Sequence, residues 1–233
     1  MGNSSSNGAK GEQMLDAVQE GKELVFYPQY CFHDQRVYHA EELLSFSKCD
    51  FKVREITINP RVGFSEVCQT DNDHQYTPRW KVDTKDWSKL FGDDSVIFRF
   101  DESGKIPETP VVEYYCQQDM FTTDFKCVNV RKGSKEGEIL FSVTKKFFSM
   151  DQYWKIWKGG KGSKGDKDYD YSFRSNTMED QRLMKNKDGQ LVALWYTDKL
   201  QATTSFRFTV APGFDTSFAL AVMVCSRVMD MKK

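Results

Sequence analysis

The chain has 233 residues, and its 33 Lys and Arg against 34 Asp and Glu give a formal net charge of −1. This balance argues against a general nucleic-acid binder, which usually carries a strongly basic face. Hydrophobic residues make up 39% of the chain and charged residues 29%, which is typical of a globular protein. No apolar stretch reaches the roughly 20 residues that a membrane-spanning helix needs, which argues against a conventional span.

The N-terminus combines a polar composition with an acylation pattern. Residues 1–13 are small, polar and rich in Gly, Ser and Asn, so we expect residues 1–23 to form a flexible tail and residues 24–233 to form one domain. The first six residues, MGNSSS, match the pattern for N-myristoylation at Gly2. One myristoyl chain gives weak, reversible membrane binding, so a second signal must come from the folded domain. The alternative is a polar tail that begins with Gly by chance.

Short alternating runs separated by turn residues predict an all-β domain. In the last of them, Phe206, Phe208 and Val210 alternate with polar residues, which favours antiparallel strands with one solvated face. We expect strands at Leu24–Phe32, Phe51–Asn59, Ser95–Phe100, Val111–Gln117, Asp124–Arg131, Glu138–Ser149, Gln152–Lys158, Tyr169–Ser175, Leu191–Thr197 and Thr203–Val210. Short helices are expected at Glu41–Phe46 and Asp83–Phe91. Met150-Asp151 and Lys187–Gly189 are typical of hairpin turns.

The C-terminal segment is the exception to the β pattern. Pro212-Gly213 ends the last strand, and Asp215 stands where a helix would begin. The following run, Phe218–Cys225, is apolar without interruption, which predicts a helix that is buried on every side. We therefore expect a barrel closed around this helix. A helix packed on one open sheet would instead show a polar stripe.

Four segments of the chain resemble the LURP-one-related family. They are residues 138–159, 170–175, 185–195 and 206–230, and the run Val210-Ala211-Pro212-Gly213-Phe214-Asp215 looks like that family's closing V-x-PG-x-D signature. The family shares the tubby C-terminal-like fold with tubby proteins and phospholipid scramblases. The resemblance thus implies an antiparallel closed barrel of about 12 strands around a central apolar C-terminal helix. The resemblance supports the fold assignment more strongly than any function, because the superfamily is functionally diverse.

A basic, glycine-rich loop is the candidate second membrane signal. Clustered cations attract anionic phospholipid headgroups, at roughly 1 kcal/mol per residue near the surface. The headgroup candidates are Lys155, Lys158, Lys161 and Lys164, with Lys167 in the same loop and Arg131, Lys132 and Lys135 in an earlier turn. The resemblance to tubby proteins, which bind phosphoinositides, favours this interpretation. The alternative is a solvated hairpin, since three aspartates (Asp166, Asp168 and Asp170) dilute the charge.

Motifs for catalysis or cofactor binding are weak. Gly160, Gly162 and Gly165 spell G-x-G-x-x-G, but a strand follows instead of the helix that a dinucleotide site needs. Asp166, Asp168 and Asp170 have EF-hand spacing, yet Tyr171 replaces the required Gly. Cys31 and His33 are close together in an expected strand, which alone is weak evidence for a catalytic or metal role. We expect no enzyme activity, no cofactor and no metal. The six cysteines are irregularly spaced, which predicts reduced thiols.

The sequence therefore predicts a non-enzymatic, N-myristoylated peripheral membrane protein of the cytoplasm. We expect its domain to be monomeric and to bind anionic phospholipid, for example a phosphoinositide, or to dock a protein partner at the membrane. The alternative is a structural or scaffold protein whose barrel is a component of a larger assembly. A third hypothesis, a lipid scramblase, rests on fold analogy alone. No nucleic-acid partner is expected.

Overall fold

The computed structural model describes residues 14–44, 49–56, 77–84, 94–99, 112–118, 125–146, 153–160, 168–176, 181–198 and 205–231. These ranges contain twelve strands, a 3-10 helix η1 (Pro28–Tyr30) and an α-helix α2 (Thr216–Met231). The strands are β1 (Arg36–Leu44), β2 (Cys49–Ile56), β3 (Thr77–Thr84), β4 (Asp94–Arg99), β5 (Val112–Gln118), β6 (Phe125–Lys132), β7 (Ile139–Lys146), β8 (Tyr153–Lys158), β9 (Tyr171–Asn176), β10 (Gln181–Asn186), β11 (Leu191–Asp198) and β12 (Ser205–Val210).

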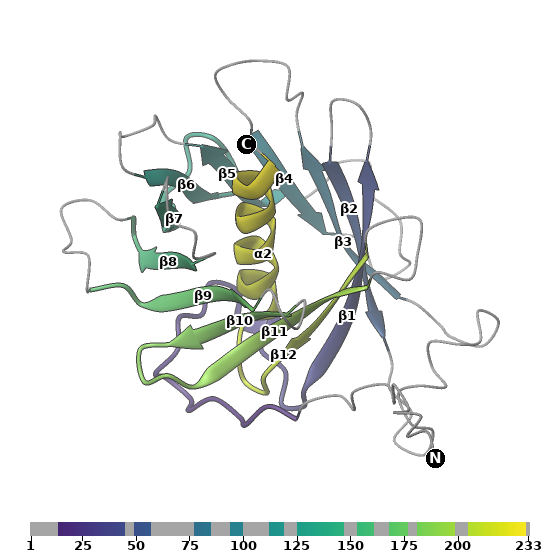
Figure 1. The fold of residues 1–233 in the computed structure, drawn as a ribbon, viewed down its shortest axis with the longest axis vertical. Coiled ribbons are helices and arrows are strands. Elements are labelled where there is room, and N and C mark those ends of the chain that lie inside the picture. The colour runs from purple at the N-terminus through teal and green to yellow at the C-terminus, as the bar shows by residue number, and fades with distance from the viewer. Residues whose placement is uncertain are drawn as a thin grey trace, which may run out of the picture.

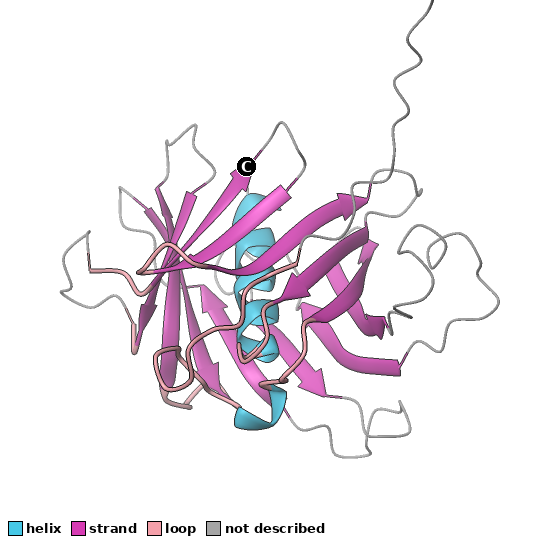
Figure 2. Ribbon diagram, turned by 90° about the horizontal axis from the view of Figure 1, so that it is seen from below, coloured by secondary structure: helices cyan, strands magenta, loops and turns pink. Residues whose placement is uncertain are grey.

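All neighbouring strands pair antiparallel. β1 pairs with both β2 and β12, so the strand order returns to its starting point and the sheet surrounds α2 (Figures 1 and 2). The expectation of an antiparallel β fold with a buried C-terminal helix is confirmed. In the described part of the chain, no helix is long and apolar enough to cross a membrane.

The core lies between α2 and the inward faces of the strands. Every side chain from Phe218 to Cys225 is buried, as the uninterrupted apolar run predicts. Aromatic rings from the strands pack on the helix: the ring centroid of Phe218 lies 4.8 Å from that of Phe141 and 5.2 Å from that of Tyr171. Edge-to-face geometry of this kind adds to the burial of apolar area.

Three of the twelve strands, β1, β3 and β10, were not expected from the sequence, and one expected strand is absent. The segment Leu24–Phe32 is not a strand, because it contains η1 and crosses one end of the barrel (Figure 1). A helix was expected at Glu41–Phe46, but residues 41–44 belong to β1, so the expectation is wrong there. Residues 45–46 lie outside the described part. The helix expected at Asp83–Phe91 begins inside β3, and residues 85–91 are not described.

The remaining strands begin within two residues of their expected positions. The turn at Lys187–Gly189 is confirmed: Gly189 has a φ of +82° and donates its N–H to the Asn186 carbonyl at 3.0 Å. Met150-Asp151 lies outside the described residues. Cys31, Cys116, Cys127 and Cys225 carry free thiols, as expected, and this finding does not extend to Cys49 or Cys68.

Residues 14–35 run along the end of the barrel where α2 begins, and we call this segment the N-terminal strap. Leu15 is buried in the core, and Val18 donates its backbone N–H to the Pro212 carbonyl at 2.9 Å. The Gln190 side chain donates to the Ala17 carbonyl at 3.1 Å. Residues 14–23 were assigned to a flexible tail, and that boundary is wrong, because the folded unit already includes them.

Candidate functional site

The structure describes two of the four headgroup candidates. Lys155 lies in the middle of β8, and Lys158 is the last residue of that strand. The side chain of Lys155 is half-buried, whereas Lys158 is exposed. Lys161, Lys164 and the acylation candidate Gly2 lie outside the described residues.

Lys155 belongs to a series of alternating cations and aromatic rings on the outer face of the barrel. Its Nζ lies 5.4 Å from the ring centroid of Tyr169. The Tyr169 ring contacts that of Tyr153, centroid to centroid at 6.4 Å, and the Arg174 Cζ lies 5.2 Å from the Tyr153 centroid. We call Tyr153, Lys155, Tyr169 and Arg174 the β8–β9 patch. Cation–π contacts at such distances orient the charges along the surface.

Strand register brings the patch together. Tyr153 is paired with Arg174, and Lys155 with Ser172, in the antiparallel ladder of β8 and β9. Because side chains alternate, these residues face outward while their neighbours Trp154 and Phe173 are buried in the core. Tyr169 precedes the start of β9, so it does not follow the alternation that the sequence predicts for it.

The patch offers neutral donors as well as charge. Burial raises the pKa of Tyr153 to about 12, and its hydrogen bond with Tyr169 acts in the same direction. The Tyr153 hydroxyl therefore keeps its proton at neutral pH. Neutral phenols and cationic side chains together can donate to several oxygens of one phosphate group.

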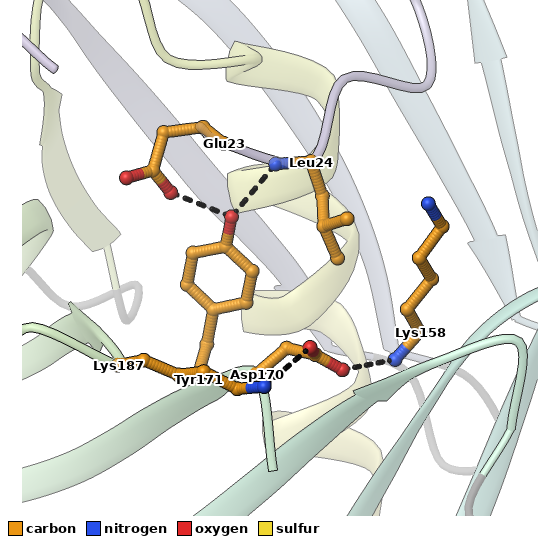
Figure 3. Close-up of polar contacts among 6 residues, drawn as sticks. All are labelled: Glu23, Leu24, Lys158, Asp170, Tyr171 and Lys187. Carbon is orange, nitrogen blue, oxygen red and sulfur yellow. Dashed lines mark hydrogen bonds and ion pairs between the residues drawn. The ribbon is translucent and has the colours of Figure 1, made fainter. Parts of the chain in front are cut away.

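Asp170 fixes the base of the basic loop beside the patch (Figure 3). One carboxylate oxygen, Oδ2, accepts the backbone N–H of Lys158 at 2.7 Å, and the other lies 3.3 Å from the Lys187 Nζ. Asp170 also donates its own N–H to the Ile156 carbonyl at 2.8 Å. The aspartate thus offsets some of the local positive charge, and it holds the backbone of Lys158 and the ammonium group of Lys187 at one edge.

The residue after Asp170 joins this edge to the strap. The Tyr171 hydroxyl donates to Glu23 Oε2 at 2.6 Å and accepts the backbone N–H of Leu24 at 2.9 Å (Figure 3). Asn186 donates to the second oxygen of Glu23 at 2.7 Å. The segment that follows the N-terminus is therefore attached to the strands that carry the patch.

Sequence reasoning missed three members of this region: Tyr169, Arg174 and Lys187. Arg174 was visible as an outward residue of an alternating strand, but its proximity to Tyr153 depends on the register between strands. Lys187 belongs to a turn signal and carries no motif. Such relationships need the pairing of β8 with β9, which the sequence pattern does not specify.

A second polar cluster lies at the buried start of α2. Asp215 Oδ1 accepts from the Ser217 N–H, the Ser217 hydroxyl and the Phe218 N–H at 3.0, 2.6 and 3.2 Å, which caps the helix. Asp215 Oδ2 accepts the backbone N–H groups of Phe26 and Tyr27, both at 2.9 Å. Burial raises the pKa of Asp215, and these donors partly oppose that rise.

Glu113 is the second buried carboxylate at this end. The register between β4 and β5 shifts between Ile97 and Phe98, so Glu113 is an extra residue opposite β4. Its carboxylate accepts from the Tyr30 hydroxyl, and from Trp80 Nε1 at 2.9 Å. Both carboxylates thus bind protein donors, which is a structural arrangement.

The nucleophile considered in the sequence lies beside Asp215. Burial and the Asp215 charge raise the pKa of the Cys31 thiol to about 11, whereas an activated thiol needs a lowered pKa. His33 is exposed two residues further on. Within the described ranges, no group of three or more His, Cys, Asp and Glu side chains could hold a metal ion.

Comparison with known proteins gives the fold and no family. No protein-family model matches the chain, and no curated protein matches it by sequence. The chain is similar to the X-ray structure of a protein from Arabidopsis thaliana, AT5G01750, with a TM-score of 0.55 and 16% sequence identity. The alignment covers 89% of this chain and 98% of that one. At this identity the likeness shows that the two chains share a fold.

Proposed function

We propose that the protein is a non-enzymatic peripheral membrane protein with a tubby-like barrel of the LURP-one-related type. In this proposal an acyl chain on Gly2 and the β8–β9 patch act together on an anionic phospholipid surface. The shared fold and the V-x-PG-x-D run at residues 210–215 support the assignment to that family.

The observation that carries the proposal is the β8–β9 patch itself. It places two cations and two phenol rings in one contiguous row on the outside of the barrel. Lys158 and Lys187 lie at its edge through Asp170. Aromatic rings that are partly exposed beside cations suit an interface where apolar and anionic groups meet, such as lipid headgroups.

Replacing Gly2 by Ala tests the acyl part of the proposal. The substitution removes the acceptor of the acyl chain and leaves the described fold unchanged, because Gly2 lies outside it. We expect the Gly2→Ala protein to move from the membrane to the supernatant fraction of lysed cells while its thermal unfolding stays unchanged. Unaltered membrane association would refute the proposed anchor, and intact mass of the wild type reads acylation directly.

The scaffold alternative gives a different result in the same experiment. If the barrel is a component of a larger protein assembly, the Gly2→Ala protein should remain in a detergent-insoluble fraction. Solubility in mild detergent with loss of membrane binding favours the lipid function. One variant, extracted with and without mild detergent, therefore distinguishes the lipid-binding hypothesis from the scaffold hypothesis.

A further inference from the structure

Asp170 and Lys187 form an ion pair at the edge of the β8–β9 patch, and its two members differ in exposure. Lys187 Nζ lies 3.3 Å from Asp170 Oδ1, with 59% of the lysine side chain exposed but only 22% of the aspartate side chain. Lys187 belongs to the hairpin turn between β10 and β11. The pair therefore joins a largely exposed, flexible lysine to a largely covered carboxylate.

The carboxylate is held in place by contacts that do not involve Lys187. Asp170 donates its backbone N–H to the Ile156 carbonyl at 2.8 Å, which extends the ladder of β8 and β9. Its Oδ2 accepts the backbone N–H of Lys158 at 2.7 Å. The side chain of Lys158 leads away from Asp170 in Figure 3, so this contact uses the backbone of Lys158 and not its ammonium group.

The Glu23 carboxylate, which also lies close to this turn, is engaged by neutral donors. Its Oε2 accepts from the Tyr171 hydroxyl at 2.6 Å, and its Oε1 accepts from the Asn186 side chain at 2.7 Å. Asn186 directly precedes Lys187 and is the register partner of Tyr171. Glu23 therefore holds the N-terminal strap, whereas Asp170 is the carboxylate that pairs with Lys187.

The ion pair and a membrane surface attract Lys187 with similar strength. An exposed ion pair stabilises a fold little, because water screens both charges and the lysine loses side-chain freedom. An anionic membrane surface strengthens binding by about fivefold for each nearby basic residue. A headgroup phosphate at this edge can therefore take Lys187 from Asp170, and the exchange needs only one flexible side chain to reorient.

We propose that Lys187 is a headgroup ligand and that Asp170 is its internal competitor. The inference rests on the proposed function and deepens it, because it adds a ligand and a built-in limit on affinity to the same surface. In the free protein, Asp170 neutralises Lys187. On an anionic phospholipid surface, a headgroup phosphate replaces the carboxylate as the partner of Lys187.

The test compares Asp170→Asn with Asp168→Asn in the myristoylated full chain. Asp168 is exposed two positions earlier, so both substitutions remove one negative charge from the same segment. Asparagine at position 170 keeps an oxygen that can accept the Lys158 N–H, and it loses the charge that pairs with Lys187. On vesicles of phosphatidylcholine and phosphatidylserine at low salt, we expect Asp168→Asn to strengthen binding by up to about fivefold, and Asp170→Asn to exceed it by about threefold.

A Lys187→Gln background shows whether Asp170 acts through Lys187. Alone, Lys187→Gln should weaken binding to the same vesicles by about two- to fivefold. In this background, Asp170→Asn and Asp168→Asn should have equal effects, because the ion pair is already absent. Vesicles of phosphatidylcholine alone should not distinguish the variants. Thermal unfolding of each variant checks that the fold is intact.

A second measurement needs no substitution. Acetylation of the wild type by an amine-reactive ester, read by peptide mass spectrometry, should decrease at Lys187 on anionic vesicles but not on neutral ones. Equal modification on both would overturn the inference. So would equal binding of Asp170→Asn and Asp168→Asn, or an excess that persists without Lys187. Wild-type binding that does not respond to phosphatidylserine would instead refute the proposed function, and the inference with it.

Discussion

Asp215 Oδ2 accepts the backbone N–H of Tyr27 at 2.9 Å, across 188 positions of sequence. The same carboxylate caps α2 through its other oxygen. One side chain therefore joins the start of the central helix to the N-terminal strap. The strap in turn reaches the strands of the β8–β9 patch through Glu23 and Tyr171.

Asp215→Asn should destabilise the fold strongly. An amide can replace only one of the two acceptor oxygens, so its NH₂ group would face either the strap donors or the helix donors. We expect the free energy of unfolding in urea to fall by about 2 to 3 kcal/mol. Asp34→Asn, at an exposed position of the strap, is the matched control and should change it by less than about 0.5 kcal/mol. Equal stabilities of the two variants would contradict the role of Asp215.

Leu220, in the buried apolar run of α2, should tolerate neither truncation nor charge. Leu220→Ala removes a side chain that is fully enclosed and should cost about 2 to 5 kcal/mol of unfolding free energy. Leu220→Asp places an unpaired charge in the core and should prevent folding into a soluble monomer. Circular dichroism and size-exclusion chromatography measure both effects, and a folded Leu220→Asp protein would be inconsistent with an enclosed helix.

Both its backbone conformation and the close approach of a neighbouring side chain favour glycine at position 213. Two substitutions, Gly213→Ala and Gly189→Ala, distinguish these two effects. The φ of Gly213 is +81°, and an added Cβ would lie 3.1 Å from Val18 Cγ2 of the strap. Gly189 has nearly the same φ, +82°, but an added Cβ there would meet nothing within 4 Å. Gly189→Ala should cost about 1 kcal/mol for the backbone conformation alone, and Gly213→Ala should cost more. The prediction fails if the two costs measured by chemical denaturation are the same.

Tyr27 should make stability depend on alkaline pH. Burial, then Glu113 and Asp215, raise the pKa of Tyr27 to about 12, so its phenol contributes stability that is complete below about pH 10 and lost as the pH rises towards 12. The unfolding free energy of the wild type should therefore fall more steeply over this window than that of Tyr27→Phe. The difference should be at most about 1 kcal/mol, because the side chain is half-exposed. Urea unfolding at about pH 9 and about pH 11 measures it, and parallel slopes would disprove the assignment.

The sequence predicts those parts of the fold in which a local pattern and the tertiary environment agree. α2 was identified because its apolar run has no polar interruption, and most strands because inward and outward residues alternate. β1 was missed because Glu41, Glu42 and Leu43 favour a helix. Its pairing with both β2 and β12 outweighs that preference.

The other sequence predictions that failed did so for the same reason: the tertiary environment outweighs the local pattern. β10 has a weak apolar pattern because Arg182 occupies an inward position, where it donates to Ser226 of the helix. The segment Leu24–Phe32 is an apolar, aromatic run like a buried strand. However, the N–H groups of Leu24, Phe26 and Tyr27 bond to the Tyr171 and Asp215 side chains instead of a neighbouring strand. At the candidate site, Lys155 and Lys158 were found from charge density. Their aromatic and acidic partners could not be predicted, because these contacts depend on the register between strands.

Vesicle binding by the acylated protein tests the central claim most directly. Enzymatically myristoylated protein is sedimented with phosphatidylcholine vesicles that contain or lack phosphatidylserine, at low and high salt. The account predicts that Lys155→Gln with Lys158→Gln weakens binding to the anionic vesicles by up to about 2 kcal/mol at low salt, at roughly 1 kcal/mol per charge, and that salt reduces this loss. The double substitution to Arg should bind like the wild type, and neutral vesicles should not distinguish the variants. Wild-type binding by the Gln variant to anionic vesicles at low salt would contradict the account.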